Sequence, residues 1–350
     1  MKQRNLEYYG TLGPACINID TLVQMFDCGM TGIRLNLSHK SLEDSAEWIR
    51  IYKDAAEKAG KEADLLIDLI GPEIRIGDLA NPLQLDKEEK VALVWQEEKK
   101  QTAGVGLEEL DKQIPIPSFV KEHLLPEQTL LMDDGKIELV VEKTEGNHSI
   151  CTITRGGHLS SRKSLALPGC QIKNPPLTAQ DHQNLKHAVE YGVTAVMQPF
   201  VRGKEDLIEL RSALKSYGAE KIRIFAKIEN MEGVEKIHEL LPYCDVLVIA
   251  RGDLGNAMPL THLPVVQQRI SNICREEDKP FMVVTQMLNS MISCAVPTRA
   301  EVTDIFHAVQ NGASSVMLTG ETAAGQYPVE AMKVLVDTAE DALSFLYQRK

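Results

Sequence analysis

A lysine and two acidic residues follow apolar runs of this sequence, and their types and spacing suit metal-assisted chemistry. Lys227 and Glu229 end the apolar run 222–229, and a spacing of two places both side chains on the same side of a strand. Asp253 follows a second apolar run, residues 246–250. Burying two carboxylates and an ammonium at strand ends is costly unless they act together. The grouping favours a divalent metal with oxygen ligands, held beside a phosphate or an enolate.

A plainer interpretation is purely structural. Glu229 and Asp253 also suit helix N-caps or ion-pair partners of Lys227 and Arg251. We prefer the metal interpretation because both carboxylates fall at the same ends of neighbouring strands, with Lys227 beside them. Asp253 also opens a segment whose backbone N–H groups suit a carboxylate or a phosphate.

A second group of polar residues alternates with apolar ones in residues 34–38. An exposed edge strand has the same pattern, but in a buried strand Arg34, Asn36 and Ser38 would all face inward. An arginine suits a phosphate, and two neutral oxygens suit an alkali cation or a substrate. Asp68 ends the next apolar run and adds an anionic ligand.

Eight short apolar, β-prone runs recur along the chain, and most are followed by a helical pattern. The runs cover residues 8–13, 32–38, 64–69, 194–200, 222–229, 245–252, 280–286 and 314–321. The main helical patterns cover residues 20–28, 41–59, 179–191, 204–217, 233–241, 263–277, 300–311 and 329–346. Buried strands alternating with helices predict an α/β fold, the (β/α)₈ TIM barrel, whose chemistry gathers at the carboxyl ends of the strands.

The third strand is not followed directly by a helix. Between residues 71 and 168 the sequence changes to short strands and turns, with strands expected at 91–95, 129–132, 137–143 and 149–155. We predict a small β-barrel domain inserted after the third strand, in a position that suits a lid. The catalytic barrel then comprises residues 1–70 and 169–350.

Composition narrows the class of protein. Hydrophobic residues make up 43% and charged residues 25%, which fits a soluble globular protein. A net charge of −12 argues against an extended nucleic-acid surface. The seven scattered cysteines include no Cys-x-x-Cys pair and indicate reduced thiols in a cytoplasmic protein. No signal peptide and no membrane-spanning run is expected.

The motifs, taken in order, resemble those of the pyruvate kinase family. They include Thr11-Leu-Gly-Pro-Ala, Arg34-Leu-Asn-Leu-Ser-His39, Asp68-Leu-Ile-Gly-Pro-Glu-Ile-Arg75, Lys227-Ile-Glu-Asn230, Ala250-Arg-Gly-Asp-Leu-Gly255, Thr285-Gln-Met-Leu288 and Gly320-Glu-Thr-Ala323. The resemblance implies a phosphotransferase that moves the phosphoryl group of phosphoenolpyruvate to ADP, giving pyruvate and ATP. It also implies that the C-terminal α/β domain of the family is missing from this sequence, while a homo-oligomer through the barrel stays possible.

The resemblance also implies a task for each site residue. Lys227, Arg34 and Thr285 would be catalytic, and Glu229 and Asp253 would hold Mg²⁺ or Mn²⁺. K⁺ would be held by Asn36, Ser38, Asp68 and the backbone carbonyl of Leu69. The glutamate at position 73 is the residue found in K⁺-dependent members of the family. The substrate would contact Gly252, Asp253, Thr285 and Thr319. Nucleotide phosphates would meet Arg75, His39, Lys163 and Asp133.

Some positions depart from the family pattern. Leu69 and Ile70 stand where the family has threonine and lysine, Pro199 stands where it has serine, and Ala166 where it has asparagine. These changes leave the expected metal and phosphate ligands in place but would affect the binding of the nucleotide. They motivate two alternatives: a related Mg-dependent enzyme with another phosphoryl acceptor or 2-oxo acid, and a catalytically weak sensor.

Overall fold

The computed structural model describes residues 6–38, 40–96, 112–133, 135–170, 172 and 174–348. The chain divides into two compact units. The barrel unit comprises Met1–Pro72, Pro175–Gly255 and Pro259–Lys350, and the β unit comprises Glu73–Asn174 and Asn256–Met258. No helix among the described residues is long and apolar enough to cross a membrane.

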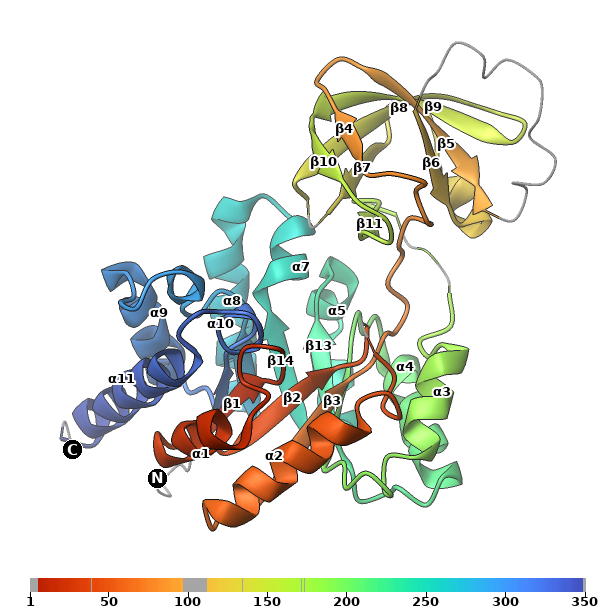
Figure 1. The fold of residues 1–350 in the computed structure, drawn as a ribbon. Coiled ribbons are helices and arrows are strands. Elements are labelled where there is room, and N and C mark those ends of the chain that lie inside the picture. Colours follow the sequence, from red (N-terminus) through yellow and green to blue (C-terminus); the bar gives the residue numbers. More distant parts are fainter. Residues whose placement is uncertain are drawn as a thin grey trace. The chain divides into compact units, whose positions relative to one another are not determined.

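The barrel unit is built on a closed ring of eight parallel strands (Figure 1). In chain order the strands are β1 (Glu7–Thr11), β2 (Gly32–Asn36), β3 (Asp64–Asp68), β12 (Ala195–Gln198), β13 (Arg223–Ile228), β14 (Val246–Ala250), β15 (Phe281–Val284) and β16 (Ser315–Met317). β1 pairs with both β2 and β16, which closes the ring. The predicted barrel is therefore confirmed, and each strand lies within its expected run apart from a residue at the start of β1.

Helices follow the strands, and the longer ones lie outside the ring (Figure 1). They are α1 (Ile19–Asp27), α2 (Ala46–Lys58), α3 (Ala179–Lys186), α4 (Lys204–Ser216), α5 (Met231–Glu235), α6 (Ile237–Leu240), α7 (Arg251–Asn256), α8 (Leu263–Glu276), α9 (Arg299–Gln310), α10 (Gly320–Ala323) and α11 (Pro328–Gln348). Short 3₁₀ turns are η2 (Ser118–His123), η3 (Leu241–Tyr243), η4 (Leu260–His262) and η5 (Asn289–Ile292).

The helices differ from the sequence expectation in four places. The helix expected at 41–59 begins only at Ala46, because the Ser41 hydroxyl and the Ser45 side chain form local turn hydrogen bonds before it. The helix expected at 179–191 ends at Lys186, and the one at 233–241 is divided at Lys236 into α5 and α6. The short helix α7 was not expected, because its Arg-Gly-Asp-Leu-Gly-Asn sequence has two glycines and no apolar period.

Side chains inside the ring form layers, because residues two apart on a strand share a side. On β13 these residues are Arg223, Phe225 and Lys227. Phe225 belongs to a buried apolar cluster drawn from seven of the strands, and its ring lies edge-on to Tyr9 with centroids 6.2 Å apart. An apolar layer thus separates the charged residues at the two ends of β13.

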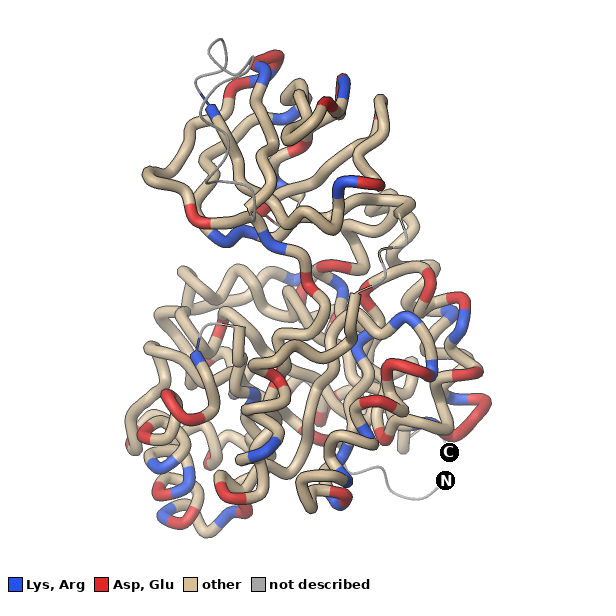
Figure 2. The backbone as a smooth tube through the Cα atoms, turned by 90° about the vertical axis from the view of Figure 1, so that its right-hand side faces the viewer, with Lys and Arg blue, Asp and Glu red and all other residues tan. Residues whose placement is uncertain are grey.

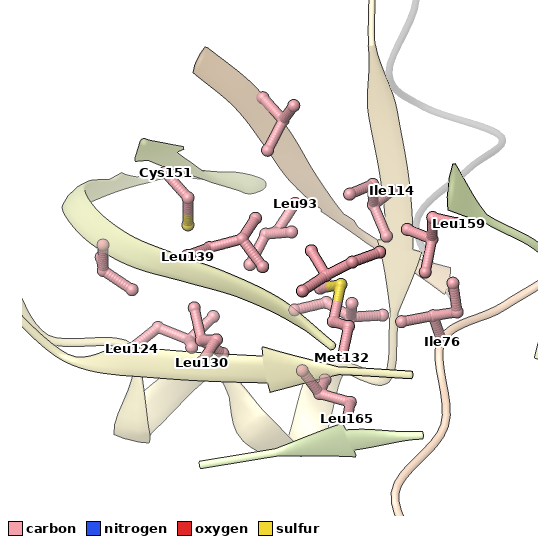
Figure 3. Close-up of a cluster of buried hydrophobic side chains, with 14 of the residues drawn as sticks. Ile76, Leu93, Ile114, Leu124, Leu130, Met132, Leu139, Cys151, Leu159 and Leu165 are labelled. Atoms are coloured by element: carbon pink, nitrogen blue, oxygen red, sulfur yellow. The ribbon is translucent and has the colours of Figure 1, made fainter. Parts of the chain in front are cut away.

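The β unit contains the expected inserted strands and some additional ones. A six-stranded sheet has the order β11-β7-β8-β9-β5-β6, and a two-stranded sheet pairs β10 with β4. Their bounds are β4 (Leu83–Leu85), β5 (Lys90–Trp95), β6 (Gln113–Ile116), β7 (Thr129–Met132), β8 (Ile137–Glu145), β9 (His148–Arg155), β10 (Gly157–Leu159) and β11 (Leu165–Ala166). Figure 3 shows their apolar side chains, among them Leu93, Leu139 and Met132, converging on one core.

Acidic and basic residues are interspersed among uncharged ones in both units (Figure 2).

Candidate active site at the carboxyl ends of the barrel strands

Arg34 and Asp68 form an ion pair at the ends of β2 and β3. Asp68 Oδ2 accepts hydrogen bonds from Arg34 Nε at 2.8 Å and lies 2.7 Å from Arg34 Nη2. Arg34 Nη1 donates to the Thr11 hydroxyl of β1 at 3.3 Å. The other Asp68 oxygen, Oδ1, is buried and has no hydrogen-bond partner among the described residues. A buried carboxylate oxygen without a donor is the kind of atom that a cation satisfies.

Lys227 reaches the same carboxylate from β13. Its Nζ lies 2.8 Å from Glu229 Oε1 and 3.5 Å from Asp68 Oδ2. Burial disfavours the ammonium, but the carboxylates of Asp68 and Glu229 outweigh it and raise the pKa of Lys227 above its ordinary value. Lys227 is therefore a fixed positive charge at neutral pH.

Glu229 is almost completely buried and is oriented by the backbone. Its Oε2 accepts a hydrogen bond from the Phe200 N–H at 2.8 Å. Burial raises the pKa of Glu229 to about 7; Lys227 opposes the rise and the Asp253 carboxylate adds to it. Two acidic side chains thus repel one another here, which is the arrangement that a divalent cation would stabilise. Asn230, not Glu229, is the N-cap of α5.

Gly252 and Asp253 lie in the first turn of α7. The Thr285 side chain is next to them, since a Cβ at Gly252 would lie 3.2 Å from Thr285 Cγ2. Thr285 has a φ of +79°, and its carbonyl accepts from Arg251 Nη2 at 2.7 Å. Arg251 thus holds the end of β15 against the start of α7.

Thr319 lies at the end of β16, beside the fully buried Glu321. The Thr319 N–H donates to Glu321 Oε2 at 2.7 Å, and the Leu288 N–H donates to Glu321 Oε1 at 3.1 Å. Glu321 therefore fixes the loop that carries Thr285 relative to the one that carries Thr319.

The remaining oxygen ligands expected in the barrel lie at adjoining strand ends. Asn36 is the register partner of Asp68 across β2 and β3, and its Oδ1 accepts the Ser38 N–H at 3.1 Å. The Leu69 N–H donates to the Met197 carbonyl at 3.1 Å, while its side chain is buried. These residues lie at the carboxyl ends of β2 and β3, and Asp68 ends β3.

Three of the residues expected to meet the nucleotide come together within the β unit. Lys163 Nζ lies 2.6 Å from Asp133 Oδ1. Arg75 forms an isolated antiparallel β-bridge with Ser164, the residue after Lys163. Burial alone would raise the pKa of Asp133, but Lys163 and Lys136 hold it below its ordinary value. The fourth, His39, lies outside the described residues.

Comparison with known proteins identifies the family. A family model described as "Pyruvate kinase, barrel domain" matches residues 3–332. Pyruvate kinase of Geobacillus stearothermophilus is 35% identical over 336 residues, which is 95% of this chain. The enzymes of Corynebacterium efficiens and Clostridium acetobutylicum are 36% and 34% identical, each over 97% of the chain. The chain belongs to the pyruvate kinase family.

The match to pyruvate kinases does not extend over their whole length. The chain spans 56% of the Geobacillus protein, 70% of the Corynebacterium protein and 72% of the Clostridium protein. The resemblance drawn from the motifs is confirmed at the level of the family and its barrel.

Within this pyruvate kinase barrel, two residues help to position the site although the sequence analysis gave them no such role. The Phe200 N–H orients Glu229. Phe200 has a φ of +52°, and a phenylalanine at this position does not predict a positive φ. Thr11 has no role in the sequence analysis beyond opening a family motif, whereas its hydroxyl accepts a hydrogen bond from Arg34.

Proposed function

We propose that this chain transfers the phosphoryl group of phosphoenolpyruvate to ADP, giving pyruvate and ATP. The observation that carries the proposal is the cluster of Arg34, Asp68, Lys227 and Glu229, in which two partly buried cations meet buried carboxylates at the carboxyl ends of barrel strands. Membership of the pyruvate kinase family supports the choice of reaction.

The two cations would supply the electrostatic part of catalysis. Arg34 is positioned by Asp68 and Thr11, so its guanidinium would bind the phosphate without reorganising. Lys227 keeps its charge because of its raised pKa and would stabilise negative charge on the transferring phosphoryl group and the developing enolate.

Glu229 and Asp253 would hold a divalent cation, Mg²⁺ or Mn²⁺. The buried Glu229 carboxylate feels the charge of Asp253, and oxygen ligands are those that such ions prefer. Among the described residues no group of three or more His, Cys, Asp or Glu side chains is placed to hold a metal, so the remaining ligands would be water and substrate oxygens. When bound, the ion would neutralise charge on the phosphoryl group and the enolate.

Asn36, Ser38, Asp68 and the Leu69 carbonyl would hold K⁺. The fit rests on Asp68 Oδ1, the buried oxygen that has no partner among the described residues. The Gly252 and Asp253 N–H groups would receive the substrate carboxylate. Thr285 would lie on the proton route to the enolate carbon, with Thr319 behind it. Arg75, Lys163, Asp133 and His39 would contact nucleotide phosphates.

A coupled assay that follows pyruvate through lactate dehydrogenase and NADH tests the proposal. We expect turnover with phosphoenolpyruvate, ADP and Mg²⁺, and a further increase when K⁺ replaces tetramethylammonium. Absence of turnover with every nucleoside diphosphate, while phosphoenolpyruvate still binds, would reject the proposed reaction. Self-association through the barrel stays a prediction, which sedimentation analysis of the same preparation would test.

A second candidate keeps the same metal and enolate site but uses another phosphoryl acceptor or 2-oxo acid. It is favoured by Leu69 and Ile70, which put apolar side chains directly after Asp68, and by Pro199, which contacts Gly71. A screen of nucleoside diphosphates and 2-oxo acids separates the candidates, because a clear preference for phosphoenolpyruvate with ADP excludes the second.

A further inference from the structure

Helix α3 carries a buried polar pair, Asp181 and Asn184, that the proposed reaction does not use. The two residues are three positions apart and therefore share a face of the helix. Asp181 is fully buried and Asn184 is 3% exposed. Buried polar side chains are costly unless their hydrogen bonds are made, so the groups that donate to the side-chain oxygens of this pair show what it stabilises.

Asp181 holds the chain directly after β3. Its Oδ1 accepts the Ile70 N–H at 2.8 Å, and its Oδ2 accepts the Gly71 N–H at 3.0 Å. The same carboxylate caps α3, because Oδ2 also accepts from the Thr178 N–H at 2.9 Å and the Thr178 hydroxyl at 2.8 Å. One buried carboxylate thus joins residues 70–71 to the start of α3.

Asn184 holds the chain after β2. Its Oδ1 accepts the Leu42 N–H at 3.0 Å, and Leu42 follows Ser38 by four positions. The loops after β2 and β3 are also joined to each other, since the Leu37 N–H donates to the Asp68 carbonyl at 3.0 Å. Both loops that carry the expected K⁺ ligands are therefore attached to one face of α3.

We propose that Asp181 and Asn184 are positioning residues that hold the two ligand loops of the monovalent-cation site. The inference rests on the proposed function for the identity of that site. Neither side chain is a ligand. Asp181 would set the backbone after Asp68, including the Leu69 carbonyl, and Asn184 would set the loop after Ser38. A preformed set of oxygens binds a cation more tightly, because less ordering is required on binding.

The test compares Asp181→Asn with Thr178→Ala. The asparagine variant turns an NH₂ group toward backbone donors and leaves at least one buried N–H of residues 70–71 or 178 unsatisfied. The Thr178→Ala variant removes the side-chain cap of α3 but leaves the carboxylate on Ile70 and Gly71. A role confined to helix capping would make the two variants alike.

The readout is the melting temperature of the full chain, without substrates, as K⁺ replaces tetramethylammonium at constant ionic strength. We expect the K⁺ concentration for half-maximal stabilisation to rise about tenfold in Asp181→Asn and to stay at the wild-type value in Thr178→Ala. If both variants respond to K⁺ as the wild type does, Asp181 only caps the helix and the inference is wrong.

Asn184→Ala is a second variant in case Asp181→Asn does not fold, and Gln180→Ala is its control. Gln180 is exposed, and its side-chain amide donates to the same Asn184 oxygen at 3.5 Å. We expect a several-fold weaker K⁺ response in Asn184→Ala only. Equal responses in the two variants would contradict the role of Asn184.

Turnover measured on the same samples separates this inference from the proposed function. A wild-type enzyme that makes pyruvate but shows no K⁺-dependent stabilisation overturns the inference and leaves the reaction. A protein that K⁺ stabilises in the expected order, yet that has no turnover, overturns the reaction and leaves the inference.

Discussion

The two ends of the barrel carry charge on the same strands. β3 begins with Asp64 and ends with Asp68, and β13 begins with Arg223 and carries Lys227 near its other end. In each pair the residues are four positions apart, so both face the same side of the strand. The apolar layer around Phe225 separates the two ends.

At the amino ends, the protein satisfies its own charges. Arg223 lies 2.7 Å from Asp64 Oδ2 and 3.1 Å from Glu7 Oε1, and it donates to the Tyr9 hydroxyl at 3.0 Å. The guanidinium also lies over the Phe225 ring, 5.3 Å from its centroid. Tyr9 in turn donates to Asp64. These groups form a closed network that fits a structural role.

At the carboxyl ends, the charges are left partly unsatisfied. Asp68 Oδ1 has no partner in the described part of the chain, and Glu229 has a pKa of about 7 because it is buried near Asp253. The difference teaches that charge alone does not mark a site. The candidate site differs from the amino ends in holding a charged oxygen, Asp68 Oδ1, that no described residue satisfies.

The difference between the two ends of the barrel is tested most directly by replacing the basic residue at each end of β13 with methionine. Lys227→Met removes the charge expected to stabilise the transition state, so we expect kcat to fall by about 10²–10³-fold. Arg223→Met should leave kcat within about twofold and lower the free energy of unfolding by roughly 1–2 kcal/mol. Steady-state kinetics and urea unfolding of both variants provide the measurement; similar losses of kcat would remove the distinction.

Metal binding should depend only on residues at the carboxyl ends of the barrel strands. At a Mg²⁺ concentration 100 times the Kd, a single site stabilises the folded protein by about 2.7 kcal/mol. We expect this gain in wild type and in Arg223→Met, and its loss in Glu229→Gln. Thermal unfolding with Mg²⁺ and with EDTA measures it, and an undiminished Mg²⁺ response in Glu229→Gln would rule out Glu229 as a ligand.

A matched pair on β3 gives a smaller effect. Asp68→Asn removes the counter-charge of Arg34 and Lys227, and hydrogen bonds to charged groups are worth enough to lower kcat/KM by roughly 10–100-fold. Asp64→Asn should instead lower stability, with kcat/KM within about twofold. The coupled assay and a melting curve decide between them, and an active Asp68→Asn enzyme would count against the proposed site.

The smallest effects come from single hydroxyls on β1. Tyr9→Phe should cost about 1 kcal/mol of stability with unchanged kinetics. Thr11→Val removes an acceptor of Arg34, so the KM for phosphoenolpyruvate should rise roughly two- to tenfold. If the two variants showed the same pattern, the ends of β1 would not differ in function.

The barrel could be predicted because its signals are local. Each strand is an apolar run, and charged residues such as Lys227 and Asp253 stand out at the ends of such runs. The contacts of Asp181 could not be predicted, because its partners Ile70 and Gly71 lie more than a hundred positions earlier in the chain. Its capping pattern with Thr178 predicts a helix start and nothing about β3.

Unusual backbone conformations were the other feature that could not be predicted from the sequence. Thr285 and Phe200 have positive φ angles, which threonine and phenylalanine rarely adopt. Tertiary hydrogen bonds hold them there, such as those from Arg251 to the Thr285 carbonyl and from the Phe200 N–H to Glu229. A propensity read residue by residue contains no information on such contacts.

The Asp181 carboxylate has a consequence for the chain as a polymer. The N–H groups of Gly71 and Thr178 both donate to its Oδ2 atom, so the barrel itself joins the two ends of the inserted segment. For a loop with joined ends, each doubling of length costs only about 0.6 kcal/mol of closure entropy. The β unit can therefore change greatly in length or content at little entropic cost to the fold that carries the chemistry.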